Sequence, residues 1–138
     1  MIGILIVSHG AFGEALIHSA SHVLGKRPLR VRQVGITTHD DPELILPQAQ
    51  DLVRQLDEGD GVLVLTDILG ATPSNIACRL LDPGKVEGVS GASLPMLIRA
   101  LTYRNEPLST VVEKAISAST ECVVRMQATD SCNAPGGS

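Results

Sequence analysis

Two short apolar runs stand out along the chain, and each ends abruptly in polar residues. Ile2–Val7 is rich in β-branched side chains and leads into Ser-His-Gly at residues 8–10. Val62–Leu65 leads in the same way into Thr-Asp at residues 66–67. Runs of this length and composition are typical of strands buried on both faces of a parallel sheet. We therefore predict two central strands with polar side chains at their ends.

Between and after these runs, apolar residues recur with the period of a helix. The pattern predicts helices over 14–24, about 46–56, 73–81, 96–103 and 108–119, and two further strands over 30–36 and 86–91. The 30–36 strand mixes polar and apolar residues, which places it nearer the sheet edge. Gly25 is a predicted helix C-cap. Pro47 is incompatible with a helix interior, so residues 42–45 are expected to form a separate turn.

Strands that alternate with helices indicate one fold class. We predict an α/β domain over residues 1–129, with a mainly parallel open sheet covered by helices on both faces in (βα)4 order, followed by a further helix. Residues 121–127 suit either a strand or a helix end. Residues 130–138 are largely Gly, Ser, Asn and Pro, which predicts a disordered C-terminal tail.

Composition narrows the classes of function. The chain has 138 residues, a net charge of -4 and only two aromatic residues, Phe12 and Tyr103. An acidic chain lacks the basic surface that nucleic acid requires, and few aromatic side chains are present to stack on bases. The three cysteines, Cys78, Cys122 and Cys132, are odd in number and have no CxxC spacing, which favours a reducing compartment.

The same composition bears on location and cofactors. No stretch reaches the ~20 apolar residues of a membrane-spanning helix, and the opening apolar run lacks the flanks of a signal peptide. We expect a cytoplasmic protein without direct membrane insertion. His18 and His22 are four residues apart but lack the Glu of the H-E-x-x-H pattern, so an exposed helix face is expected there. We expect no metal site and no cofactor.

The candidate chemistry lies where the two central strands end. In open parallel sheets, functional groups gather at the carboxyl ends of the strands. His9 and Asp67 emerge side by side there if their strands are neighbours. A carboxylate that accepts a hydrogen bond from one ring nitrogen fixes the histidine tautomer and leaves the other nitrogen as a nucleophile. This pair suits transfer of a phosphoryl group onto and off His9.

A turn after Asp67 supplies a candidate phosphate cradle. Gly70 and Ala71 are small enough for backbone N–H groups to approach an anion, and Thr72 and Ser74 offer hydroxyl donors. Pro73 suits the first turn of the following helix, whose N-terminus favours negative charge. Taken singly, a histidine at a strand end, a capping aspartate and a small-residue turn each have ordinary structural explanations. The hypothesis depends on their convergence, and it fails if Thr66–Asp67 does not lie beside Ser8–His9.

Four residues elsewhere in the chain are expected to have purely structural or surface roles. His39 lies in the loop after the second strand, on the same edge as His9, and is expected to be a plain loop residue. Cys78 is expected to be a small buried side chain. Surface solvation is expected for the two arginines on or just past the 96–103 helix, Arg99 and Arg104.

Two motifs together resemble a known family. Ile-Val-Ser-His-Gly at residues 6–10, followed by Asp-Ile-Leu-Gly-Ala-Thr-Pro-Ser-Asn at 67–75, is similar to the mannose/fructose-type enzyme IIA (EIIA) of the bacterial phosphoenolpyruvate-dependent sugar phosphotransferase system (PTS). Gly-Ala-Ser-Leu-Pro-Met-Leu at residues 91–97 resembles the segment after that family's fourth strand. The likeness covers about residues 1–126.

The resemblance implies a complete functional scheme. His9 would accept a phosphoryl group from the phosphocarrier protein HPr and pass it to a IIB component, with Asp67 as its hydrogen-bond partner. Thr72, Ser74 and the backbone around Gly70 and Ala71 would hold the phosphate. The last regular segment, residues 121–127, would be an antiparallel edge strand exchanged between the subunits of a homodimer. Association with a membrane permease complex is a further implication.

The chain also departs from the family pattern. Some relatives carry an aromatic residue where this chain has Leu69, so the surface that meets partner proteins is expected to differ. No IIB domain is expected in this chain, and the sugar is not assigned. The alternative functions are a phosphorylation-dependent regulatory protein of an incomplete PTS, and an enzyme such as a histidine phosphatase or a tetrapyrrole metal chelatase. Ser8 argues against the phosphatase, which has Arg before its histidine.

Overall fold

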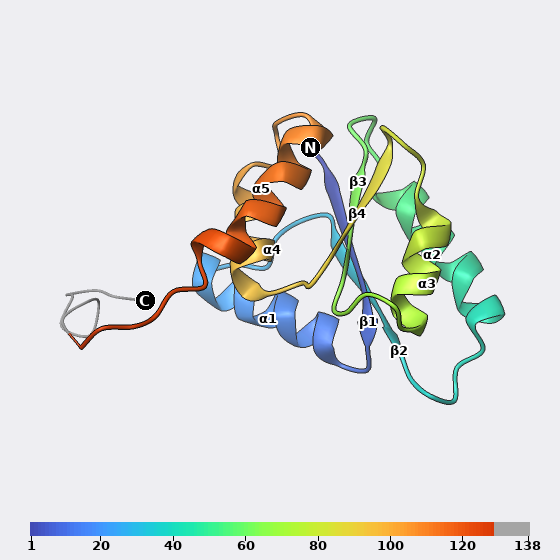
Figure 1. The fold of residues 1–138 in the computed structure, drawn as a ribbon. Helices are drawn as coiled ribbons and strands as arrows, with labels where there is room; N and C mark the ends of the chain where they lie inside the picture. The colour runs from blue at the N-terminus through green and yellow to red at the C-terminus, as the bar shows by residue number, and fades with distance from the viewer. Residues whose placement is uncertain (129–138) are drawn as a thin grey trace.

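The computed structural model describes residues 1–128 and shows strands and helices that alternate along most of the chain (Figure 1). The elements are β1 (Gly3–His9), α1 (Phe12–Leu24), β2 (Val31–Ile36), α2 (Pro42–Leu56), β3 (Val62–Thr66), α3 (Thr72–Leu80), β4 (Val86–Ser90), α4 (Leu94–Thr102) and α5 (Leu108–Glu121). The predicted elements are confirmed to within a few residues, apart from the start of α2. Gly25 ends α1 in the left-handed conformation, with φ of 81°.

The four strands form one parallel sheet in the order β2-β1-β3-β4. Helices α1, α4 and α5 cover one face and helices α2 and α3 cover the other (Figure 1). This arrangement confirms the α/β class and places β2 at an edge, as its mixed composition predicts. The central strands β1 and β3 have helices on both faces, which explains why their sequences are continuously apolar.

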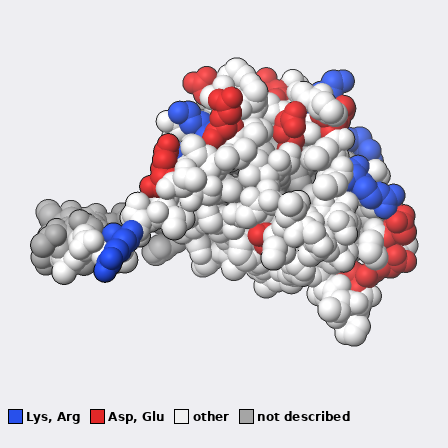
Figure 2. Space-filling view, in the orientation of Figure 1, with Lys and Arg blue, Asp and Glu red and all other residues white. Residues whose placement is uncertain are grey.

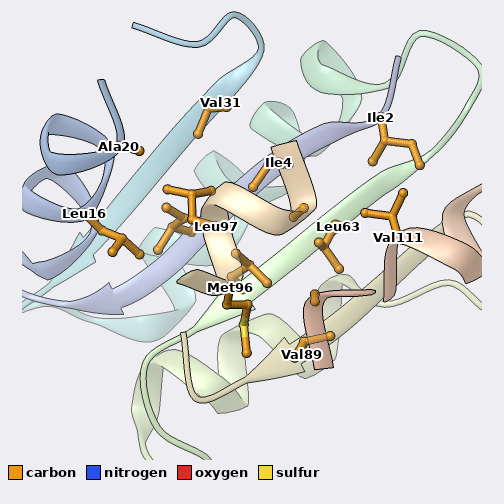
Figure 3. Packing of buried hydrophobic residues seen from close by; sticks show 14 of the residues in the cluster. Ile2, Ile4, Leu16, Ala20, Val31, Leu63, Val89, Met96, Leu97 and Val111 are labelled. Carbon is orange, nitrogen blue, oxygen red and sulfur yellow. The ribbon is translucent and has the colours of Figure 1, made fainter. Parts of the chain in front are cut away.

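The core is divided by the sheet into two layers. Successive side chains of a strand point to opposite faces. Ile4 and Ile6 therefore pack with Leu97 on the α4 side, while Leu5 and Val7 pack with the helices on the far side. Figure 3 shows Ile4 and Leu63 of the sheet close to Met96 and Leu97 of α4. These two layers fix β1 and β3, and so fix the positions of the residues at their ends.

Helix α2 begins earlier than predicted. Asp41 caps it, because its Oδ1 accepts a hydrogen bond of 3.0 Å from the Glu43 N–H, and Pro42 occupies the first turn. The separate turn expected over 42–45 is therefore wrong. Pro47 removes only the hydrogen bond to the Glu43 carbonyl, and Glu43 is exposed, so water can satisfy that group.

The antiparallel edge strand implied for 121–127 does not form within the described part of this single chain. Glu121 is still helical, and residues 122–128 have no regular secondary structure. Val123 and Val124 are 77% and 71% exposed. A strand requires a paired edge, and one exchanged between subunits finds that edge only in its partner. The domain end at 129 and the tail over 130–138 lie outside the described residues.

Candidate active site

The polar ends of β1 and β3 lie beside each other. The two strands pair in parallel, and Val7 is in register with Thr66. His9 ends β1 and Asp67 directly follows β3, so both reach the same edge of the sheet. The condition on which the hypothesis depends is therefore met.

One carboxylate oxygen contacts His9 twice. Asp67 Oδ2 accepts a hydrogen bond of 3.0 Å from the His9 backbone N–H and lies 2.8 Å from His9 Nδ1. The other oxygen, Oδ1, accepts a hydrogen bond of 3.0 Å from the Ile68 N–H. The two contacts of Oδ2, with the backbone N–H and with Nδ1 of His9, hold the imidazole in one orientation. The His9 side chain is 52% exposed and that of Asp67 only 14%, so the ring faces solvent over a largely buried carboxylate.

The ionisation state of Asp67 decides the tautomer of His9. Burial acts to raise the pKa of the Asp67 carboxyl, but the hydrogen bonds and charge interaction with His9, with a further backbone bond, outweigh it and lower the pKa. Asp67 is thus a carboxylate at neutral pH and can only accept hydrogen bonds. His9 Nδ1 must therefore carry the proton, and Nε2 of the neutral ring has a free lone pair.

The turn after Ile68 is shaped by Ser74. This buried hydroxyl accepts hydrogen bonds from the N–H groups of Gly70 (2.8 Å) and Ala71 (3.1 Å) and donates one of 2.9 Å to the Ala71 carbonyl. The prediction that Ser74 donates to a phosphate conflicts with this bonding, because its proton is already used within the turn. The same holds for the N–H groups of Gly70 and Ala71. Ser74 acts instead as the residue that closes the turn.

Thr72 is placed differently from Ser74. It is the first residue of α3 and is exposed, and within residues 1–128 its hydroxyl makes no hydrogen bond. Among the predicted phosphate-binding residues, Thr72 therefore keeps an available donor. It stands at the N-terminus of a helix, where the backbone dipoles favour an anion.

Gly35 supports the His9 loop and is absent from the site residues predicted from the sequence. A Cβ atom on Gly35 would lie 2.1 Å from the carbonyl oxygen of Gly10, so only glycine lets β2 approach the residue after His9 this closely. The Gly10 N–H also donates a hydrogen bond of 2.9 Å to the Ile36 carbonyl. An isolated glycine within a predicted strand is the signal that points to such an approach.

The remaining candidate residues lie away from this pair. His39 is exposed, and no hydrogen bond or ion pair of the described residues joins it to His9 or Asp67. His18 and His22 are exposed on α1, as expected for a solvated helix face. The charged groups between β2 and α2 are acidic, and no lysine or arginine lies in residues 37–41 or 67–71.

Two expectations about side-chain burial are wrong. Cys78 is exposed, because α3 turns Ile76, Ala77 and Leu80 toward the core and leaves residue 78 outside. Arg104 is buried, with 6% of its surface exposed, because backbone carbonyl groups surround its guanidinium. Arg99 is partly exposed and bonds to Glu121 and to the Ser117 hydroxyl.

Comparison with known proteins points to the family that the sequence motifs resemble. A family model described as "PTS system fructose IIA component" matches residues 3–117. The mannose-specific EIIAB component of the PTS from Escherichia coli K12 is 29% identical over 130 residues, which are 92% of this chain and 40% of that protein. The chain thus spans about two fifths of the length of this relative. The fructose-specific EIIA component from Bacillus subtilis 168 is 27% identical over 105 residues, 75% of this chain and 71% of that protein.

A solved structure extends the match to three dimensions. The crystal structure of the EIIA component from Streptococcus agalactiae superposes with a TM-score of 0.80 and 30% identity, over 91% of this chain and 97% of that one. Among residues 1–128, no helix is both long and apolar enough to cross a bilayer. The family match over most of the domain and the shared fold lead to one conclusion: this chain belongs to the mannose/fructose-type EIIA family of the sugar phosphotransferase system.

Proposed function

We propose that this protein is a histidine phosphocarrier. It takes a phosphoryl group from phospho-HPr on Nε2 of His9 and passes the group to a IIB component of a sugar PTS. The observation that carries the proposal is the contact of Asp67 Oδ2 with both the backbone N–H and Nδ1 of His9. This contact leaves Nε2 as the nucleophilic atom on a half-exposed ring.

The transfer step uses the Asp67 carboxylate to balance charge. The Nε2 lone pair forms a bond to phosphorus as the bond between phosphorus and the donor breaks, and the bonding electrons leave with the donor. The His9 ring gains a positive charge because Nδ1 keeps its proton. Asp67 stabilises that charge at 2.8 Å without itself taking the proton. Transfer to the acceptor reverses these changes and restores the neutral ring.

Thr72 and the N-terminus of α3 are proposed to bind the phosphoryl oxygens. The phosphoryl group is negative throughout the transfer, so a free hydroxyl and a helix N-terminus favour it. In this scheme Gly70, Ala71 and Ser74 contribute the shape of the turn that presents Thr72.

Apolar side chains near His9 are proposed to meet the partner proteins. Ile68 and Leu69 directly follow Asp67 and are 57% and 71% exposed, and Phe12 at the start of α1 is 38% exposed. Exposed apolar groups of this kind mark protein–protein contact sites. They support HPr and IIB, both proteins, as the donor and acceptor.

A homodimer is proposed from the edge of the sheet. Strand β4 has a strand neighbour on only one side among the described residues, and Val123 and Val124 are exposed on an extended segment. Figure 2 shows few charged side chains on the face that carries β4. Residues 122–128 of a second copy could pair with the open side of β4, and this pairing would cover Val123 and Val124. We also propose a cytoplasmic location, in line with two exposed free thiols, Cys78 and Cys122.

Phosphotransfer tests the function. The protein is incubated with phosphoenolpyruvate, enzyme I and HPr, and its intact mass is measured. We expect a species one phosphoryl group heavier that requires HPr, forms in His39→Ala and is absent in His9→Ala. An unmodified wild-type protein would overturn the proposal. Phosphorylation that no IIB component can accept would point instead to a regulatory role.

A further inference from the structure

A cavity with cationic residues in its lining lies near the start of β1, at the other end of this strand from His9. It has a volume of about 440 Å³ and lies between the loop that follows α1 and the end of α4. Its walls are apolar, since they include Leu24, Pro28, Leu29 and Leu101. Leu29 is 73% exposed, so part of this apolar wall faces solvent.

Arg104 contributes a buried charge to this cavity without a carboxylate partner. Its guanidinium donates two hydrogen bonds to the Ile2 carbonyl, one of 2.6 Å to that of Leu29 and one of 3.1 Å to that of Arg30. Four of the five N–H donors of the group are thus used, and one on Nη1 remains. Carbonyl groups satisfy donors but do not neutralise charge, and no acidic residue of the described chain forms an ion pair with Arg104.

The other cations of the lining are Lys26, Arg27 and the α-amino group of Met1, which pairs with Asp60. Arg27 is paired with Glu14, with Nη1 3.0 Å from Oε1, so its charge is balanced. Lys26 lines the same cavity and is exposed, and it makes no ion pair within residues 1–128. Arg104 and Lys26 therefore line the cavity without an ion-pair partner among the described residues, beside apolar walls.

We infer that this cavity binds a small amphipathic monoanion, such as a carboxylate with a short apolar chain. The anionic head would lie against Arg104 and Lys26, where it compensates a buried charge. The apolar chain would cover Leu24, Leu29 and Leu101. The inference is independent of the phosphocarrier proposal, because the cavity lies near the start of β1 and His9 lies at its end.

Octanoate is the probe, and the amide NMR spectrum of the full chain is the measurement. We expect saturable shifts confined to residues 24–30 and 101–104. Octanol, which has the chain without the charge, binds more weakly. Acetate lacks most of the apolar chain and binds at least about a hundredfold more weakly, given ~0.8 kcal/mol per buried methylene group.

Two variants test the charge and the wall separately. Lys26→Gln removes the unpaired cation and is expected to weaken octanoate binding about fivefold. Leu29→Gln replaces an exposed apolar side chain and should weaken the binding of octanoate but not that of acetate. The control Lys85→Gln removes a lysine from the exposed turn before β4 and should leave binding unchanged. The inference is overturned if octanoate gives no saturable shifts, if octanol binds equally well, or if Lys26→Gln and Lys85→Gln behave alike.

Discussion

Replacing Asp67 with asparagine separates the charge of this residue from its shape. The asparagine would keep the size of the side chain and one oxygen acceptor, but it would present no negative charge to His9. The amide oxygen can still accept a hydrogen bond from the His9 backbone N–H. In that orientation the same oxygen faces Nδ1, and this bond loses its charge. In the flipped orientation the amide NH₂ group would face Nδ1 and favour the tautomer with the proton on Nε2. Phosphorylation of His9 is therefore expected to slow.

The size of the effect follows from the contact. A hydrogen bond to a charged group contributes about 1.5–3 kcal/mol. The His9 side chain is 52% exposed, so solvent weakens the interaction and the lower end of this range applies. A loss of about 1.5 kcal/mol in the transition state corresponds to a rate about tenfold slower.

The assay is the rate of phosphoryl transfer from phospho-HPr, followed by intact mass after rapid quenching. Asp41→Asn is the matched control, because it removes a charge from the same sheet edge while Asn remains a good N-cap for α2. We expect a wild-type rate for Asp41→Asn and an unchanged circular dichroism spectrum for both variants. A wild-type rate for Asp67→Asn, or equal slowing by both variants, would refute the role of the contact.

Further predictions concern stability. The folded-state pKa of Asp67 lies below its ordinary 3.8, so its contribution to stability is present above that value and lost as pH falls through the folded pKa. The unfolding free energies of wild type and Asp67→Asn should therefore differ at about pH 5 and converge in acid, and an unchanged gap in acid would contradict this. Gly35→Ala places a Cβ atom 2.1 Å from the Gly10 carbonyl oxygen. Urea denaturation should show that the free energy of unfolding falls by about 1–3 kcal/mol, and His9 phosphorylation should be slower. A change below about 0.5 kcal/mol would argue against the close approach. Arg104→Met leaves the carbonyls of Ile2 and Leu29 without their donor, while that of Arg30 keeps the Ile4 N–H. Thermal or urea unfolding should report a loss of about 3–5 kcal/mol, whereas a loss under about 1 kcal/mol would rule out a structural role for the guanidinium.

The sheet and its active edge could be predicted from sequence because their signals are local. A continuous β-branched run marks a strand with helices on both faces, and the abrupt change to Ser-His or Thr-Asp marks where the strand ends. Parallel strands carry their carboxyl ends to one edge, so two such endings are sufficient to bring His9 and Asp67 together.

What could not be predicted depends on contacts between distant segments. Buried Arg104 donates a hydrogen bond to the carbonyl of Ile2, 102 positions away in the chain. Nothing in the neighbouring sequence distinguishes Arg104 from a surface arginine. Ser74 looks like a free donor until its bonds to the Gly70–Ala71 turn are known. Residues 122–128 have no regular secondary structure in this single chain, and the pairing proposed for them involves a second copy, which one sequence does not reveal.

The central claim is that Asp67 holds the proton on Nδ1 so that Nε2 of His9 accepts the phosphoryl group. The measurement that tests it most directly is NMR of the phosphorylated protein with ¹⁵N-labelled histidine, in which phosphorus–nitrogen coupling identifies the modified atom. We predict coupling to Nε2 of His9 and a proton on Nδ1. Phosphorus on Nδ1 of His9, or on any of the other three histidines of the chain, would contradict the account.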